Sequence, residues 1–169
     1  HVDAGLGALR LGLAAVGEIH PAAERAYAGL ARLVMAAGGT VVMPESALPL
    51  ATDTDWQREF GIERPSPTLG YGESTAVPGL HVMETPTSDW GETLTGLGAT
   101  GVEIIVAHSA THPLASHRMV PAIQTTSDGN LLTGDFDLRL TDGDAGALLD
   151  IVLRIASRLG ELHCRIHDR

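Results

Sequence analysis

Short apolar runs alternate along the chain with segments of helical periodicity, and this alternation predicts a layered fold of strands and helices. Three continuous apolar runs, each preceded by glycine and followed by polar or turn residues, are typical of buried strands: 40–43, 80–83 and 102–107. Less regular runs at 119–125 and 136–140 predict two further strands. Residues 9–17 are also apolar and fit either a strand or a short helix.

Three segments place apolar residues three and four positions apart, which predicts amphipathic helices: 22–37, 89–99 and 145–159. Pro21 fits the first turn of the first helix, because proline there needs no amide hydrogen. We expect Ser88 to cap the second helix and Asp142 or Asp144 to cap the third. Gly160 is expected to end the third helix, with a frayed tail beyond it.

The succession of strand, loop, helix and strand over 80–107 forms a βαβ unit, which belongs to a parallel sheet covered by helices. Between the strands at 40–43 and 80–83 the sequence predicts a short helix at 53–60 and a long loop over 65–79. A chain of 169 residues is the size of one domain. We therefore predict a single three-layer α/β domain spanning 1–169, with a mostly parallel sheet.

Composition narrows the classes of partner. The formal net charge of −10 argues against nucleic acid and anionic membrane surfaces, because phosphate binding needs a basic surface. No apolar run reaches membrane-spanning length, and no signal segment opens the chain, so a cytoplasmic setting is expected. Cys164 is the single cysteine, which excludes an internal disulfide. The chain begins at His1, so a processed product, a tag remnant and a part of a longer protein all stay open.

Polar groups with catalytic potential follow three of the predicted strands. Glu45 and Ser46 follow one strand, Glu84 and Thr85 a second, and His108 begins the segment after a third. Ligands of open α/β sheets bind outside the carboxyl ends of strands, so these groups are candidates for one shared site. A general base beside hydroxyl groups suits proton abstraction or hydration chemistry. The alternative is that the glutamates cap neighbouring helices or hold the loops.

The loop after strand 102–107 is the densest group of candidate residues: His108, Ser109, Thr111, His112, His117 and Arg118. Three histidines at this spacing suggest metal ligands, but a loop containing Pro113 makes a joint metal site less plausible than contact with a carboxylate substrate. Solvated loop residues are the third alternative. Arg118 suits a bidentate pair with a substrate carboxylate, or equally with a surface acid. His163, Cys164 and His167 near the C-terminus are not expected to bind metal.

Several segments in order resemble one family of lyases. A Gly-Gly-Thr strand opens 38–46 (GGTVVMPES), Glu84-Thr85-Pro86 ends the next strand, and 95–101 (TGLGATG) lies in the following helix. The strand 120–124 (VPAIQ) closes the pattern. Together, 38–46 and 79–125 resemble the C-terminal part of the altronate/galactarate dehydratase family, which includes sugar-acid dehydratases and the large subunit of a sulfolactate sulfo-lyase.

This resemblance implies loss of water, or of a related leaving group, from a hydroxy-carboxylate with a divalent metal, namely iron, manganese or magnesium. Glu45, Glu84, His108 and His112 would then be the catalytic candidates. The expected substrate-binding residues are Ser46, Thr85, Ser109, Thr111, His117 and Arg118. The family also implies an N-terminal catalytic domain or subunit, which could hold the metal outside this chain. A homo-oligomer stays open.

Two departures from the family pattern define the alternative function. Family members carry a Cys-Gly-Gly-Ser-Asp segment ahead of the first helix, whereas the chain has 14–20 (AAVGEIH) there. The glycine-rich strand-end loop of the family is replaced by the histidine-bearing segment after 102–107. The alternative is therefore a non-catalytic domain that binds small acids or serves in assembly.

Overall fold

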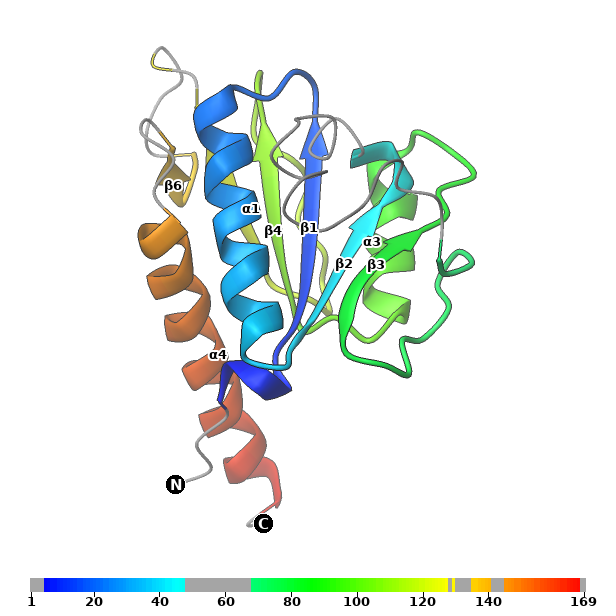
Figure 1. The fold of residues 1–169 in the computed structure, drawn as a ribbon, viewed down its shortest axis with the longest axis vertical. Helices are drawn as coiled ribbons and strands as arrows, with labels where there is room; N and C mark the ends of the chain where they lie inside the picture. Colours follow the sequence, from blue (N-terminus) through cyan, green and yellow to red (C-terminus); the bar gives the residue numbers. More distant parts are fainter. Residues whose placement is uncertain (1–4, 48–67, 128, 130–134, 141–144, 168–169) are drawn as a thin grey trace.

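Six parallel strands form the centre of the computed structural model, which describes residues 5–47, 68–127, 129, 135–140 and 145–167. The strands lie in the spatial order β3-β2-β1-β4-β5-β6, and every pair is parallel (Figure 1). Their bounds are β1 Arg10–Val16, β2 Thr40–Pro44, β3 Gly79–Met83, β4 Ile104–Ser109, β5 Ala122–Thr126 and β6 Leu138–Arg139. The predicted α/β class is confirmed, with all described strand pairs parallel rather than most.

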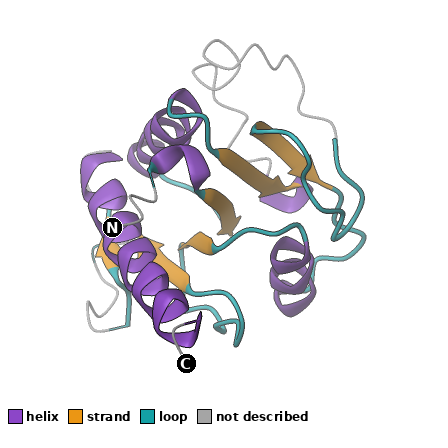
Figure 2. Cartoon of the chain, turned by 90° about the horizontal axis from the view of Figure 1, so that it is seen from below, coloured by secondary structure: helices purple, strands orange, loops and turns teal. Residues whose placement is uncertain are grey.

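Helices cover both faces of this sheet, as the view along the strands in Figure 2 shows. Helices α1 (Pro21–Ala36) and α4 (Ala145–His167) share one hydrophobic core with one face. Helix α3 (Trp90–Ala99) packs in a second core on the opposite face. A short 3-10 helix, η1 (Leu6–Ala8), precedes β1. Strand side chains alternate between the cores, so Leu13 belongs to the first and Ala14 to the second.

Several predicted boundaries move in the structure. The segment 9–17 is a strand, and the predicted strand 119–125 begins at Ala122. The cap of α3 is Asp89 rather than Ser88, since the Asp89 carboxylate accepts the Glu92 backbone N–H at 2.8 Å. The backbone of α4 continues as helix past Gly160 to His167, because a glycine tolerates a helical interior at moderate cost. The predicted helix 53–60 and the capping residues Asp142 and Asp144 lie outside the described residues.

The direction of chain connection reverses between β1 and β4, the two central strands. From β1 the chain passes through α1 to β2 on one side, and from β4 it passes to β5 on the other side. The two connections also leave toward opposite faces, because α1 contributes to one core and the segment after β4 to the other. The carboxyl ends of β1 and β4 are therefore the reversal point of the sheet, the position at which doubly wound sheets bind ligands.

The connection from β4 to β5 contains no helix in the described segment 110–121. It crosses the face of α3 instead, and Leu114 and Val120 bury their side chains in the same core as α3. Two side chains fasten it: the Trp90 Nε1–H donates to the Ala115 carbonyl at 2.8 Å, and Gln124 bonds the Leu114 backbone twice. Among the described helices, none combines the length and apolar content that crossing a membrane requires.

Candidate functional site at the carboxyl edge

The ends of β1 and β4 meet directly at the reversal point. Val16 is in register with Ser109, and the Ala110 N–H donates to the Val16 carbonyl at 3.4 Å. Gly17 turns the chain away with a φ of 84°, and a Cβ there would lie 3.4 Å from the Ala110 methyl group. A side chain at position 17 would be strained by its backbone conformation, so glycine suits this crossing of the two loops.

Ser109 organises the loop that follows β4. Its hydroxyl donates to the His112 carbonyl at 2.6 Å and accepts the His112 N–H at 3.4 Å, which closes a tight turn. The Thr111 hydroxyl lies 2.8 Å from His112 Nδ1, and both side chains are exposed. The structure thus gathers Ser109, Thr111 and His112 at the reversal point, where Ser109 is buried and the other two side chains are exposed.

His108 takes a different direction from these neighbours. Its ring is fully buried on the α1 face of the sheet, edge-on to Tyr27 at a centroid distance of 6.3 Å. Its Nδ1 lies 3.3 Å from the Thr125 hydroxyl, and its Nε2 lies 3.4 Å from the Ser127 hydroxyl. The Tyr27 hydroxyl is 2.9 Å from the same Thr125 oxygen. These four residues form a polar network between α1, β4 and β5.

Burial controls the protonation of this network. Removal from water disfavours the imidazolium, and the nearby His20 acts in the same direction, so the pKa of His108 falls to about 4. Burial likewise raises the pKa of the Tyr27 hydroxyl, with Thr125 opposing the rise. At neutral pH both groups are therefore uncharged, and His108 acts as a hydrogen-bonding group rather than a cation.

The two glutamate-bearing strand ends lie next to each other. Pro44 pairs with Met83 in the sheet, and the Ser46 N–H donates to the Thr85 hydroxyl at 3.0 Å. Glu45 is half-buried and Glu84 is exposed. Strand β1 lies between β2 and β4, so His108 is two strand spacings, about 10 Å, from the end of β2. The structure thus joins Glu45–Ser46 to Glu84–Thr85 and keeps His108 apart from them.

His117 and Arg118 lie toward the opposite end of the sheet. The chain has crossed the α3 face by this point, and a Cβ at Gly98 would come 3.8 Å from the His117 ring. The His117 Nδ1 accepts two backbone N–H groups, from Met119 and Val120, both at 3.2 Å. This imidazole therefore shapes the turn into β5, and the sequence cluster of three histidines is spread over two ends of the molecule.

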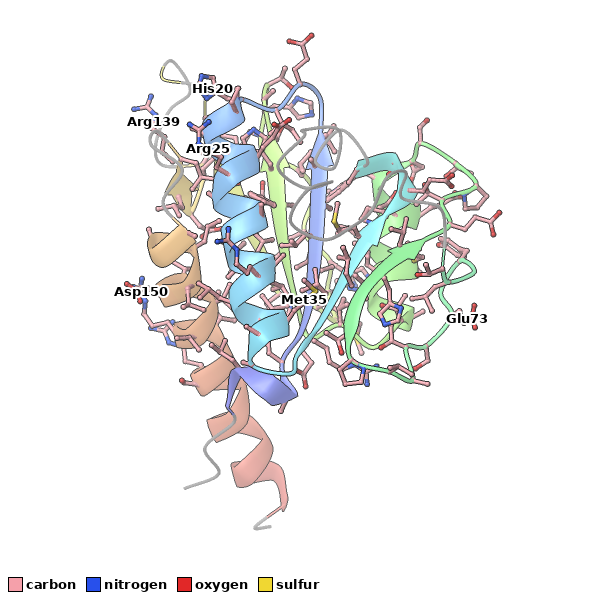
Figure 3. All side chains as sticks on the ribbon, in the orientation of Figure 1. His20, Arg25, Met35, Glu73, Arg139 and Asp150 are labelled. Carbon is pink, nitrogen blue, oxygen red and sulfur yellow. The ribbon has the colours of Figure 1, made fainter. Side chains whose placement is uncertain are left out.

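Basic side chains accumulate around the carboxyl edge of an otherwise acidic chain. Figure 3 shows His20, Arg25 and Arg139 toward the end of the molecule at which β1 and β4 finish. His20 directly precedes α1, and its Nδ1 accepts the Ala22 N–H at 3.2 Å. The same edge carries Glu45 and Glu84, so these basic groups lie among acidic ones.

Arg10 is a basic residue at the other edge of the sheet, beside a cavity of about 190 Å³ that Thr40 and Thr75 also line. Its guanidinium donates to both the carbonyl and the hydroxyl of Thr75. It also lies against Gly101, just past α3, where the negative end of the helix dipole favours a cation. These contacts give Arg10 a structural role in holding the segment 75–78 to α3.

The described residues do not fit the divalent metal that the family resemblance implies. No group of three or more His, Cys, Asp or Glu side chains in the described part of the chain is arranged to hold a metal ion. His108 is engaged with hydroxyl groups, and His117 accepts backbone amides. No step of a mechanism is therefore derived through a metal for these residues.

Tyr27, Thr125 and Ser127 belong to the site although the sequence did not indicate them. Tyr27 lies on the apolar face of α1, where an aromatic residue is expected to belong to the hydrophobic core. Thr125 and Ser127 belong to β5 and to the segment just after it. Only the parallel pairing of Thr125 with His108 brings them to the imidazole.

Comparisons with known proteins add no relative. No protein-family model matches the chain, and no curated protein matches it at a significant level.

Proposed function

We propose that the chain is the acid-binding domain of a carbon–oxygen lyase, which removes water from a hydroxy-carboxylate such as a sugar acid. The reversal point between β1 and β4 carries this proposal, because the exposed Thr111 hydroxyl and His112 imidazole follow β4 at the position at which doubly wound sheets bind ligands. The resemblance to the altronate/galactarate dehydratase family supports the substrate class.

The candidate residues divide into two groups by their surroundings. The exposed Thr111 and His112 side chains at the reversal point suit hydrogen bonds to the carboxylate and hydroxyl groups of a sugar acid, and Ser109 holds the turn that carries them. Glu45 and Glu84 are the carboxylates at the same edge that suit proton transfer. A catalytic N-terminal domain or subunit, any metal that it holds, and a cytoplasmic setting stay predictions from the sequence.

The second candidate function is a non-catalytic acid-binding domain. Full burial of His108 favours it, because an acid–base group must reach a proton of the substrate directly or through one water. The two functions differ in turnover: a lyase converts a bound sugar acid to a keto-deoxy acid, whereas a binding domain returns it unchanged.

Titration of the 169-residue chain with galactarate, followed by amide NMR, tests the proposed site. We expect saturable shifts at 17–20 and 109–112 with a dissociation constant of about 1 mM or tighter. His112→Ala should weaken binding by about five- to ten-fold, because one hydrogen bond to a charged group is lost.

His81→Ala is the matched control. This histidine lies in β3, away from the ends of β1 and β4, and its Nε2 contacts the Val77 carbonyl at 2.7 Å. Galactarate affinity should be unchanged in this variant, and galactitol, which lacks carboxylates, should not bind. Absence of galactarate binding, or shifts confined to the amino edge near Arg10, would reject the proposed function.

A further inference from the structure

In the polar network of Tyr27, His108, Thr125 and Ser127, only one placement of the hydrogen atoms gives every buried donor an acceptor among the described residues. The Tyr27 hydroxyl is fully buried and protonated, and its hydrogen-bond partner is Thr125 Oγ1 at 2.9 Å. A buried O–H without an acceptor is costly, so Tyr27 donates to Thr125. The single proton of the Thr125 hydroxyl is then available for its other neighbour.

That neighbour is the Nδ1 atom of His108, 3.3 Å away. When Thr125 donates to it, Nδ1 must hold a lone pair, and the one proton of a neutral imidazole resides on Nε2. The Nε2–H then donates to Ser127 Oγ at 3.4 Å. If Nδ1–H donated to Thr125 instead, the Thr125 hydroxyl would accept both bonds, and its own proton would have no acceptor among the described residues.

The network therefore runs in one direction, from the interior toward the carboxyl edge. Ser127 follows β5 and is half-buried, whereas the other three residues are fully buried. Because Ser127 Oγ accepts from the imidazole, its own proton is turned away from His108 and can be donated to another oxygen.

We propose that Thr125 is a positioning residue that holds His108 in its Nε2–H tautomer. Through that imidazole it sets the Ser127 hydroxyl as a hydrogen-bond donor to a ligand oxygen at the carboxyl edge. The first step stands on the network alone, and the second rests on the proposed function.

NMR of the chain labelled with ¹⁵N-histidine tests the first step, since the shifts of the two ring nitrogens report the tautomer. At pH 7 we expect the Nε2–H form of His108 in roughly ten-fold excess or more. Thr125→Val removes the donor to Nδ1, so the excess should fall by about five-fold, and Thr125→Ser should keep the wild-type ratio. Tyr27→Phe should also keep it, because Nδ1 is still the acceptor for the Thr125 proton among the described residues.

Tyr71→Phe is the matched control, because it removes a tyrosine hydroxyl that donates to the Glu92 carbonyl of α3, on the opposite face. The His108 tautomer should not change in this variant. A majority of the Nδ1–H form in the wild type, or an unchanged ratio in Thr125→Val, would overturn the proposal.

Galactarate titrations of single and double variants test the second step. Ser127→Ala should weaken binding by about five-fold and Thr125→Val by about three-fold. Adding Thr125→Val to Ser127→Ala should cause no further loss, because the network acts through the Ser127 hydroxyl. Additive losses would contradict the role of Ser127. If the wild type does not bind galactarate, the proposed function fails, while the tautomer ratio still decides the positioning role.

Discussion

At the scale of single residues, His108 lies beneath α1 with its ring edge-on to Tyr27 and no exposed surface. In the sequence, its position at the end of an apolar run made it a candidate site residue. The side chains of a strand alternate between the two faces, so Ser109 points toward the α3 layer and His108 toward α1. Neighbouring residues in the sequence consequently serve different parts of the site.

Acidification should destabilise the fold through His108. Its pKa is about 4 in the folded chain and about 6.5 when unfolded, so the unfolded state binds the proton first. The stabilising contribution is complete above pH 6.5 and is lost as pH falls from 6.5 to 4. Its size is on the order of 3 kcal/mol, since one pKa unit corresponds to about 1.4 kcal/mol. Urea unfolding at a series of pH values measures this loss.

The variant His108→Gln isolates this contribution, because glutamine does not titrate. Tyr27 in α1 and His20 ahead of it are the titratable groups that face His108, and both remain in the variant. The free energy of unfolding of His108→Gln should depend less steeply on pH between 6.5 and 4 than that of the wild type. Parallel pH profiles for the two proteins would show that His108 is not the group responsible.

At the scale of elements, the segment 110–121 replaces a crossover helix with a loop that is fixed by side chains. The Leu114 side chain packs in the α3 core. The Gln124 side-chain amide accepts the Leu114 backbone N–H at 2.7 Å and donates to the Leu114 backbone carbonyl at 2.8 Å. Apolar periodicity cannot predict such a segment, because its order depends on one glutamine in the following strand. The same fastening carries His117 away from the carboxyl edge.

Loss of the Gln124 amide should loosen this loop. We expect Gln124→Ala to lower the free energy of unfolding by about 1–3 kcal/mol, because two partly buried backbone groups of Leu114 lose their partner. Hydrogen exchange at the Leu114 amide should accelerate more than exchange in β1. Thr95→Ala removes an exposed hydroxyl that donates to the Gly91 carbonyl within α3, and it should change neither quantity appreciably. Unaltered exchange in Gln124→Ala would argue against this fastening.

At the scale of the whole molecule, one sheet separates two cores and also joins them. Leu30 of α1 is fully buried in the core on one face, and Leu97 of α3 in the core on the other. Both cores are built on the same backbone hydrogen bonds of β1 and β4, so neither can melt without disturbing the other.

Unfolding of the chain should therefore be a single transition. Leu30→Ala and Leu97→Ala should each lower the unfolding free energy by roughly 2–5 kcal/mol and leave one coincident transition by circular dichroism and tryptophan fluorescence. Leu33→Ala, on the exposed side of α1, removes a leucine that is 41% exposed and should cost much less. Two separate transitions in either buried variant would mean that the cores unfold independently.

The sequence by itself determined the class of fold and the edge at which to look for function. Apolar runs bounded by glycine, and helices whose apolar residues recur at three and four positions, are local signals that survive without tertiary context. They placed Glu45, Glu84 and the segment after 102–107 at strand ends. The order of the strands and the reversal between β1 and β4 came only from packing.

Tertiary structure alone decided which of these candidates meet. Parallel pairing of His108 with Thr125 and burial under Tyr27 created the polar network, and neither contact has a signal in local spacing. The crossing loop separated His117 from His112, although only four residues lie between them in the chain. The physical reason is that side-chain direction and long-range pairing depend on register and packing, which one stretch of sequence does not encode.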